Sequence, residues 1–71
     1  SGFAGVAKWI NDNYGLEGGH AVDKHSDVVR YVKTWIDSEY ESGRVSAIGG
    51  AEIRRKVDEF ITSDESVRGN W

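Results

Sequence analysis

The sequence contains no cysteine, no proline and no long apolar run. Without cysteine the chain forms no disulfide, and since small secreted domains usually carry such bridges, we expect a cytoplasmic protein. No apolar stretch approaches the roughly 20 residues that span a bilayer, and no signal-peptide pattern is present, so we expect no membrane partner. Without proline, the turns must be made by the 9 glycines.

Length, charge and aromatic content limit the chain further. Its 71 residues make one domain at most, near the size at which a single core is only marginally stabilising. The formal net charge of −3 argues against a general phosphate-binding surface. Three tryptophans, three tyrosines and two phenylalanines give large apolar contacts to a small core. We therefore expect one small, aromatic-rich domain of marginal stability.

The apolar residues near the N-terminus recur at helical rather than strand spacing. One helical face is formed by Phe3, Val6, Ala7, Ile10 and Tyr14. Gly15 follows, at the place where a helix commonly ends with a left-handed residue. The pattern predicts a first helix from Phe3 to Tyr14 and then a glycine-rich loop over residues 16–25.

A second helix is predicted from Asp27 to Ser42. Ser26 is a good N-cap, Asp27 favours the helix dipole in the first turn, and Gly43 is the expected stop. The inward stripe consists of Val28, Val29, Val32, Trp35, Ile36 and Tyr40. Packing must hold this helix, because its valines lower its intrinsic propensity.

A second glycine-containing loop over residues 45–50 leads into a third predicted helix. Ser46 or the Gly49–Gly50 pair opens this helix. Its inward residues are Ile53, Val57, Phe60 and Ile61. We expect it to fade within residues 62–66, where the apolar periodicity stops.

The predicted elements define an all-α fold, a small three-helix bundle with two glycine-containing loops. We expect residues 1–66 to form this single domain and residues 67–71 to form an irregular C-terminal tail. Trp71, in that tail, either docks back on the domain or stays free.

No pattern indicates a catalytic or metal centre. His20, Asp23 and His25 can each ligate a metal, but zinc sites usually pair three or four ligands and the chain has no further His or Cys. Two histidines in solvent are the favoured interpretation. The alternating carboxylates of the second helix cannot converge as an acid–base pair, and the two glycine pairs lack the context of a phosphate-binding loop. We expect no catalytic residue, metal or cofactor in the isolated chain.

A short basic run, Arg54-Arg55-Lys56, lies on the third predicted helix. In a three-helix domain such a run suggests the hypothesis of helix-turn-helix DNA binding, in which the last helix enters the major groove. The long second helix, the long loop and the surrounding acidic residues argue against it. A solvated helical face is the favoured interpretation.

The aromatic residues give a different indication. Trp9 and Tyr31 lie off the apolar stripes of their helices. In so small a domain not every large ring fits inside, so Trp9, Tyr31 and Trp71 are candidates for contact with another protein. The alternative is that the loops and the C-terminal tail cover these rings.

Two stretches resemble a known family. Residues 1–11, SGFAGVAKWIN, are similar to the segment that follows the catalytic barrel in the isopropylmalate synthase and homocitrate synthase (DRE-TIM metallolyase-like) family. Trp9-Ile10-Asn11 and residues 40–46, YESGRVS, are most similar to members without the regulatory domain, such as citrate- and homocitrate-like synthases. The order of the helices is also similar, over roughly residues 1–62.

The resemblance implies a C-terminal helical subdomain. Family members condense acetyl-CoA with a 2-oxo acid on a metal-binding TIM barrel, which would lie upstream of Ser1. Their helical subdomain packs on the partner subunit and helps to close its active site, supplying a polar residue such as tyrosine. The resemblance therefore implies Tyr40 as an in-trans contact, with Arg44 contacting a carboxylate through its planar fork. The alternatives are a core or rim Tyr40 and a solvent-facing Arg44 at a helix C-terminus.

Two classes of function remain. The first is a non-catalytic accessory or dimerisation subdomain of an acetyl-CoA-dependent 2-oxo-acid condensing enzyme, whose protein partner is its own catalytic domain or a second subunit. The second is an independent helical protein–protein interaction module. A helix-turn-helix DNA binder is the least favoured.

Overall fold

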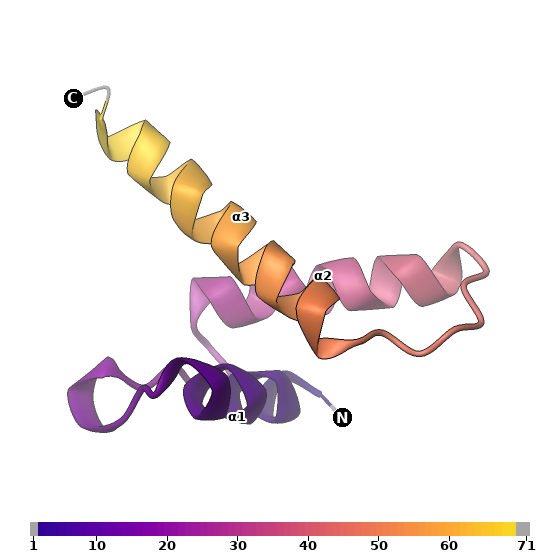
Figure 1. Cartoon of the computed structure of the whole chain (residues 1–71), viewed down its shortest axis with the longest axis horizontal. Coiled ribbons are helices and arrows are strands. Elements are labelled where there is room, and N and C mark those ends of the chain that lie inside the picture. The colour runs from indigo at the N-terminus through magenta and orange to yellow at the C-terminus, as the bar shows by residue number, and fades with distance from the viewer. Residues whose placement is uncertain (1, 70–71) are drawn as a thin grey trace.

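The computed structural model describes the backbone of residues 2–69 and the side chains of residues 2–63. These residues form three α-helices, α1 (Phe3–Tyr14), α2 (Asp27–Glu41) and α3 (Gly50–Gly69), and one 3-10 turn at Gly18–His20. Helix α2 packs against both other helices, and α3 crosses it and then leaves the body of the bundle (Figure 1). The predicted all-α, three-helix fold is confirmed.

The first two helices keep the predicted limits closely. Helix α1 spans the predicted residues and is followed by Gly15, whose N–H bonds to the Asn11 carbonyl and whose left-handed φ of 65° lets the next N–H, that of Leu16, reach the same carbonyl at 2.9 Å. Helix α2 begins at Asp27 as predicted and ends one residue early, at Glu41, before Gly43 with φ 101°. Both stops are glycines in a conformation that other residues rarely adopt.

The third helix ends later than predicted. Helix α3 begins at the Gly49–Gly50 pair, one of the two predicted starts, but it continues to Gly69 instead of fading within residues 62–66. No glycine or proline interrupts residues 51–68, so nothing breaks the backbone hydrogen bonds there, and a loss of apolar periodicity is no stop signal. Of the predicted irregular tail, 67–69 is helical and Trp71 lies outside the described residues.

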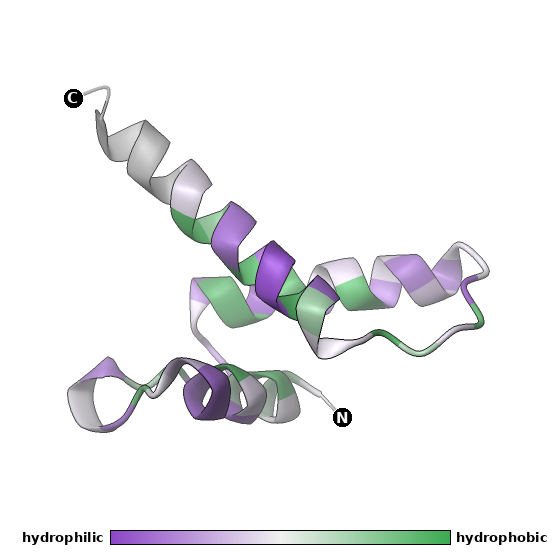
Figure 2. Ribbon diagram, viewed as in Figure 1, coloured by the Kyte–Doolittle hydropathy of each residue, from purple (hydrophilic) through white to green (hydrophobic). Residues whose placement is uncertain are grey.

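The core is small and aliphatic. Its buried residues, each at most 5% exposed, are Ala7, Ile10, Val29, Val32 and Val57. All three helices contribute, and the apolar segments are concentrated where the helices meet (Figure 2). Burying each of the larger side chains stabilises the fold by about 1.5–3 kcal/mol. None of the buried residues is aromatic, so the rings of the described aromatic residues lie around this core.

Three residues predicted to face inward are largely exposed. Phe3 is 44%, Tyr40 46% and Ile61 43% exposed. Phe3 opens α1, Tyr40 lies near the end of α2, and Ile61 lies on the part of α3 that leaves the bundle (Figure 1). Each continues an apolar stripe past the point where a neighbouring helix covers it.

Among the described residues, no helix is long and apolar enough to cross a membrane.

Candidate interaction surface

The two loop histidines lie in different turns: His20 ends the 3-10 turn at Gly18–His20, and His25 lies in the turn that leads into α2. The Asp23 carboxylate accepts a hydrogen bond from the His25 N–H at 2.7 Å, and the Ser26 hydroxyl oxygen accepts one from the Asp23 N–H at 3.0 Å. Ser26 takes the predicted N-cap position, but its hydroxyl makes no cap bond to the helix. Within residues 2–63, no group of three His, Cys, Asp or Glu side chains is arranged to hold a metal ion.

Arg44 contacts carboxylates of its own chain. Its Nη1 lies 2.8 Å from Glu52 Oε1 and 3.1 Å from Glu39 Oε1, and its Nη2 lies 2.6 Å from Glu52 Oε2. It also donates to the carbonyls of Ser46 at 3.0 Å and Ala47 at 3.3 Å. We call these five residues the Arg44 cluster. With 18% of its side chain exposed, Arg44 is not the solvent-facing residue that one prediction placed at the helix end.

The electrostatics of the Arg44 cluster follow from this geometry. The hydrogen bonds from Arg44, and then the Gly49 N–H, lower the pKa of Glu52 to about 2, while Glu52 raises the pKa of Arg44. Glu52 lies three residues after Gly49 and accepts its N–H at 3.2 Å, which is the carboxylate half of a capping box. This spacing is visible in the sequence and could have predicted the start of α3.

Tyr40 lies on the rim of the bundle beside the α2–α3 connection. Its hydroxyl oxygen accepts a hydrogen bond from the Ile48 N–H at 3.3 Å, and about half of the side chain stays exposed. The ring lines an apolar groove between the three helices, together with Gly2, Gly5, Val6, Trp9, Lys33, Ile36, Asp37 and Ile53. The alternatives to an in-trans contact were a Tyr40 in the core and a Tyr40 on the rim, and this placement agrees with the rim.

Trp9 lies further inside than its place on the helix suggests. Its ring is half-buried against the core and faces the first residue of α3, where a Cβ added to Gly50 would approach to 3.2 Å. The prediction that Trp9 lies off the apolar stripe overlooks α3, which covers that side of α1. Its indole is therefore only partly available to another protein.

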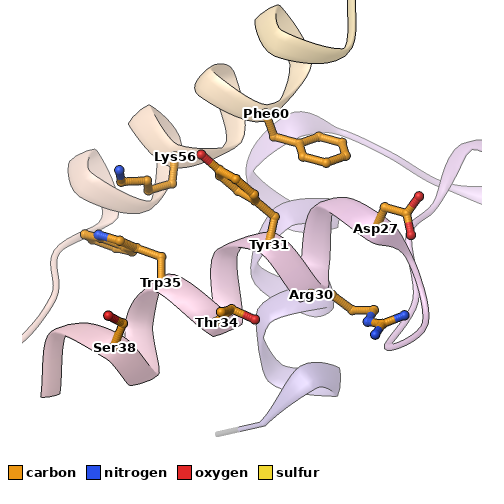
Figure 3. Close-up of a pocket in the computed structure, with 8 residues that line it drawn as sticks. All are labelled: Asp27, Arg30, Tyr31, Thr34, Trp35, Ser38, Lys56 and Phe60. Carbon is orange, nitrogen blue, oxygen red and sulfur yellow. The ribbon is translucent and has the colours of Figure 1, made fainter. Parts of the chain in front are cut away.

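Tyr31 is exposed on a second groove, between α2 and α3 (Figure 3). Its ring packs against Phe60 with centroids 5.4 Å apart, and its hydroxyl donates to Glu59 at 2.9 Å, which raises the pKa of Tyr31. Along the same groove the Lys56 ammonium lies 5.2 Å from the centre of the Trp35 ring. This groove is lined by Asp27, Arg30, Tyr31, Thr34, Trp35, Ser38, Lys56 and Phe60.

Two cations of the basic run are engaged within the chain. Arg54 lies over the Tyr14 ring at 4.6 Å and donates to the Asn13 carbonyl at 3.2 Å, which ties α3 to α1. Lys56 pairs with Glu59 at 3.2 Å. Arg54 and Arg55 are exposed, as the predicted solvated face requires, and Arg54 in addition ties α3 to α1.

Fold and surface together define a small all-α bundle with exposed apolar surface, and comparison with known proteins gives its relatives. The chain is 43% identical over 61 residues to a citrate (Re)-synthase of Syntrophus aciditrophicus, which covers 86% of this chain and 10% of that protein. It is 37% identical over 61 residues to a citrate (Re)-synthase of Clostridium kluyveri, with 86% and 14% covered. It is 31% identical over 67 residues to a 2-phosphinomethylmalate synthase of Streptomyces hygroscopicus, with 94% and 14% covered.

These relatives confirm the family resemblance predicted from the sequence. The chain is related to a segment of condensing synthases and spans only 10% to 14% of the length of the curated relatives it matches. No protein-family model matches the chain, and no solved structure matches it.

Proposed function

We propose that this chain is a non-catalytic helical accessory subdomain of an acetyl-CoA-dependent 2-oxo-acid condensing enzyme, and that it packs on the catalytic part of its own or a second subunit. One observation carries the proposal: 86% of the chain is similar to a segment that makes up only 10% of a citrate (Re)-synthase. In such a relative the segment stands beside a much larger remainder. A surface for packing on that remainder is what an accessory subdomain needs.

The exposed apolar side chains support this role. The large apolar residues with high exposure are Phe3, Tyr31, Tyr40, Val45 and Ile61. Contiguous exposed apolar surface on a small domain commonly marks a contact with another protein. The groove beside Tyr40 offers such a surface, because most of its lining is apolar and all three helices contribute to it.

Tyr40, and not Arg44, is the residue that we propose to reach a partner's active site. Within the described residues the Tyr40 hydroxyl accepts one hydrogen bond and donates none, so its O–H can donate to a substrate oxygen. The planar fork of Arg44 is already occupied by Glu52 and Glu39. A substrate carboxylate would have to displace both of them.

A segment exchange tests the proposal. The matching segment of the Syntrophus aciditrophicus citrate (Re)-synthase is replaced by this chain, and citrate formation and subunit assembly are measured. We expect the chimera to assemble and to form citrate, whereas a variant that lacks the segment does neither. A folded chimera without activity, next to an active parent enzyme, would contradict the proposal.

The second candidate is an independent interaction module. It is favoured by the groove around Tyr31 and Phe60, which needs no synthase to explain it. The same exchange separates the two candidates, because an independent module has no reason to restore a synthase. An inactive chimera would therefore favour this second candidate.

A further inference from the structure

The connection between α2 and α3, residues 42–49, is held at many points. The Arg44 guanidinium bonds the carbonyls of Ser46 and Ala47, and Glu39 and Glu52 hold it from the two flanking helices. The Ile48 N–H is bound by the Tyr40 hydroxyl. The backbone of this loop is therefore fixed before any partner arrives.

Val45 projects from this fixed loop into solvent. It is 98% exposed, the highest value among the exposed large apolar residues of the described chain. Within the described residues, almost no other side chain covers it. An ordered loop that presents an apolar side chain binds at a lower entropy cost, since little freedom remains to be lost on docking.

The end of α2 next to Val45 is negatively charged. Three carboxylates, Asp37, Glu39 and Glu41, lie in its last five residues, where the helix dipole disfavours negative charge, and this last turn has no basic residue. Asp37 is paired with Lys33 and Glu39 with Arg44. Within the described side chains, Glu41 has no ion-pair partner.

This charge decides what kind of surface fits. A second copy of the chain, bound face to face about a two-fold axis, would bring two Glu41 carboxylates and the negative ends of two α2 helices together. Like charges placed opposite each other disfavour such a contact. A partner that offers an apolar socket beside a lysine or arginine would satisfy both Val45 and Glu41.

We infer that the end of α2 and the loop after it, which carry the exposed Glu41 and Val45, form a face that docks on the catalytic part of the synthase, at an apolar socket flanked by a basic side chain. This inference rests on the proposed function and adds the face that is used and the chemistry of its partner. The occupant is a synthase surface because the relatives carry most of their length outside the matched segment. A second copy would meet the repulsion described above.

The test uses the chimera described above with single substitutions on this face. We expect Val45→Asp and Glu41→Lys each to lower assembled, active enzyme by about tenfold or more, the size of one well-packed interface contact. Both positions are exposed, so the circular dichroism of the isolated chain should stay unchanged and its thermal midpoint should not fall; Glu41→Lys should raise the midpoint slightly, because it replaces a negative with a positive charge at the C-terminal end of α2. Matched controls on the α1–α2 loop, Ala21→Asp and Glu17→Lys, place the same charges on another exposed surface. They should leave activity unchanged.

The outcomes separate the two claims. If the unsubstituted chimera is inactive, the proposed function fails and this inference fails with it. If the chimera is active and the Glu41 and Val45 variants match the Ala21 and Glu17 controls, only the inference about the docking face is overturned. Loss confined to the Glu41 and Val45 variants supports it.

Discussion

The two connections between helices are held by different chemistry. Between α1 and α2, the Asn11 side chain donates to the Val22 carbonyl at 2.9 Å and accepts from its N–H at 2.8 Å, a neutral and partly buried pair. Between α2 and α3, the charged Arg44 guanidinium holds the loop backbone and is itself bound by the Glu39 and Glu52 carboxylates. In each case one side chain holds the loop backbone. The neutral anchor should be insensitive to acid and salt, and the ionic anchor should respond to both.

The largest expected effect comes from removing the neutral anchor. Asn11→Ala leaves both polar groups of the Val22 backbone without their partner, and such a loss costs about 1–3 kcal/mol per group where water does not replace it. We expect a clear fall of the free energy of unfolding, measured by urea titration with circular dichroism. Asn13→Ala, which removes a bond within α1 on an exposed surface, is the control and should change much less. Equal effects would contradict the anchor role of Asn11.

A smaller effect is expected at the two glycines that end the helices. Both have positive φ, 65° at Gly15 and 101° at Gly43, and a Cβ at either position would meet no neighbour within 4 Å. The loss of stability in these variants therefore comes from backbone strain alone, and Gly15→Ala should lower the free energy of unfolding by about 1 kcal/mol. Gly43→Ala should cost more, because its φ lies further from the left-handed region that alanine can enter. Thermal unfolding of the two variants gives this order directly.

Removing the ionic anchor should destabilise the chain less than Asn11→Ala. Arg44→Met keeps the length of the side chain but leaves Glu39 and Glu52 without their cation, and both carboxylates can turn to water. The urea midpoint should fall slightly, and the remaining stability should lose part of its salt dependence. Lys24→Met is the matched control, since it removes an exposed cation on the α1–α2 loop, away from the cluster. A loss as large as that of Asn11→Ala would overturn the ranking.

The smallest effect is a dependence on acid. The pKa of Glu52 is lowered from 4.5 to about 2, so its ionised form stabilises the folded chain above pH 4.5. This contribution disappears as the pH falls from about 4.5 towards 2, because protonation then removes the bond to Arg44. Glu59, whose pKa is lowered by the bonds from Tyr31 and Lys56, adds to the same slope. Urea midpoints across this range should fall less steeply in Glu52→Gln, while Asn11→Ala should keep the full slope.

Sequence reasoning predicted the helices well because their stop signals are local. Gly15 and Gly43 end α1 and α2 where the pattern placed them, since a left-handed residue needs no information beyond its neighbours. The end of α3 was missed because its sequence lacks such a signal before Gly69. Helix existence therefore followed from periodicity, and helix length followed only where a glycine marked it.

The candidate surface was less predictable, because it depends on where the helices cross. Trp9 lies off the stripe of α1 but is half-buried by α3. Arg44 and Glu52 are eight residues apart, and only the path of the loop makes them partners. Nothing in the sequence marks Val45 as exposed, because the direction of a loop side chain depends on the path of the loop backbone. Tyr40 was singled out by family resemblance, and its place on the rim is compatible with that role without testing it.

The Arg44 cluster also determines how the chain opens. One guanidinium joins Glu39 on α2, the loop carbonyls and Glu52 on α3, so opening the last turn of α2 and opening the first turn of α3 both break bonds to the same side chain. Segments linked in this way exchange their amide hydrogens as one cooperative unit. The amides of residues 39–41 and 53–55 should therefore exchange their hydrogens at one common rate, although more than ten residues of chain lie between them.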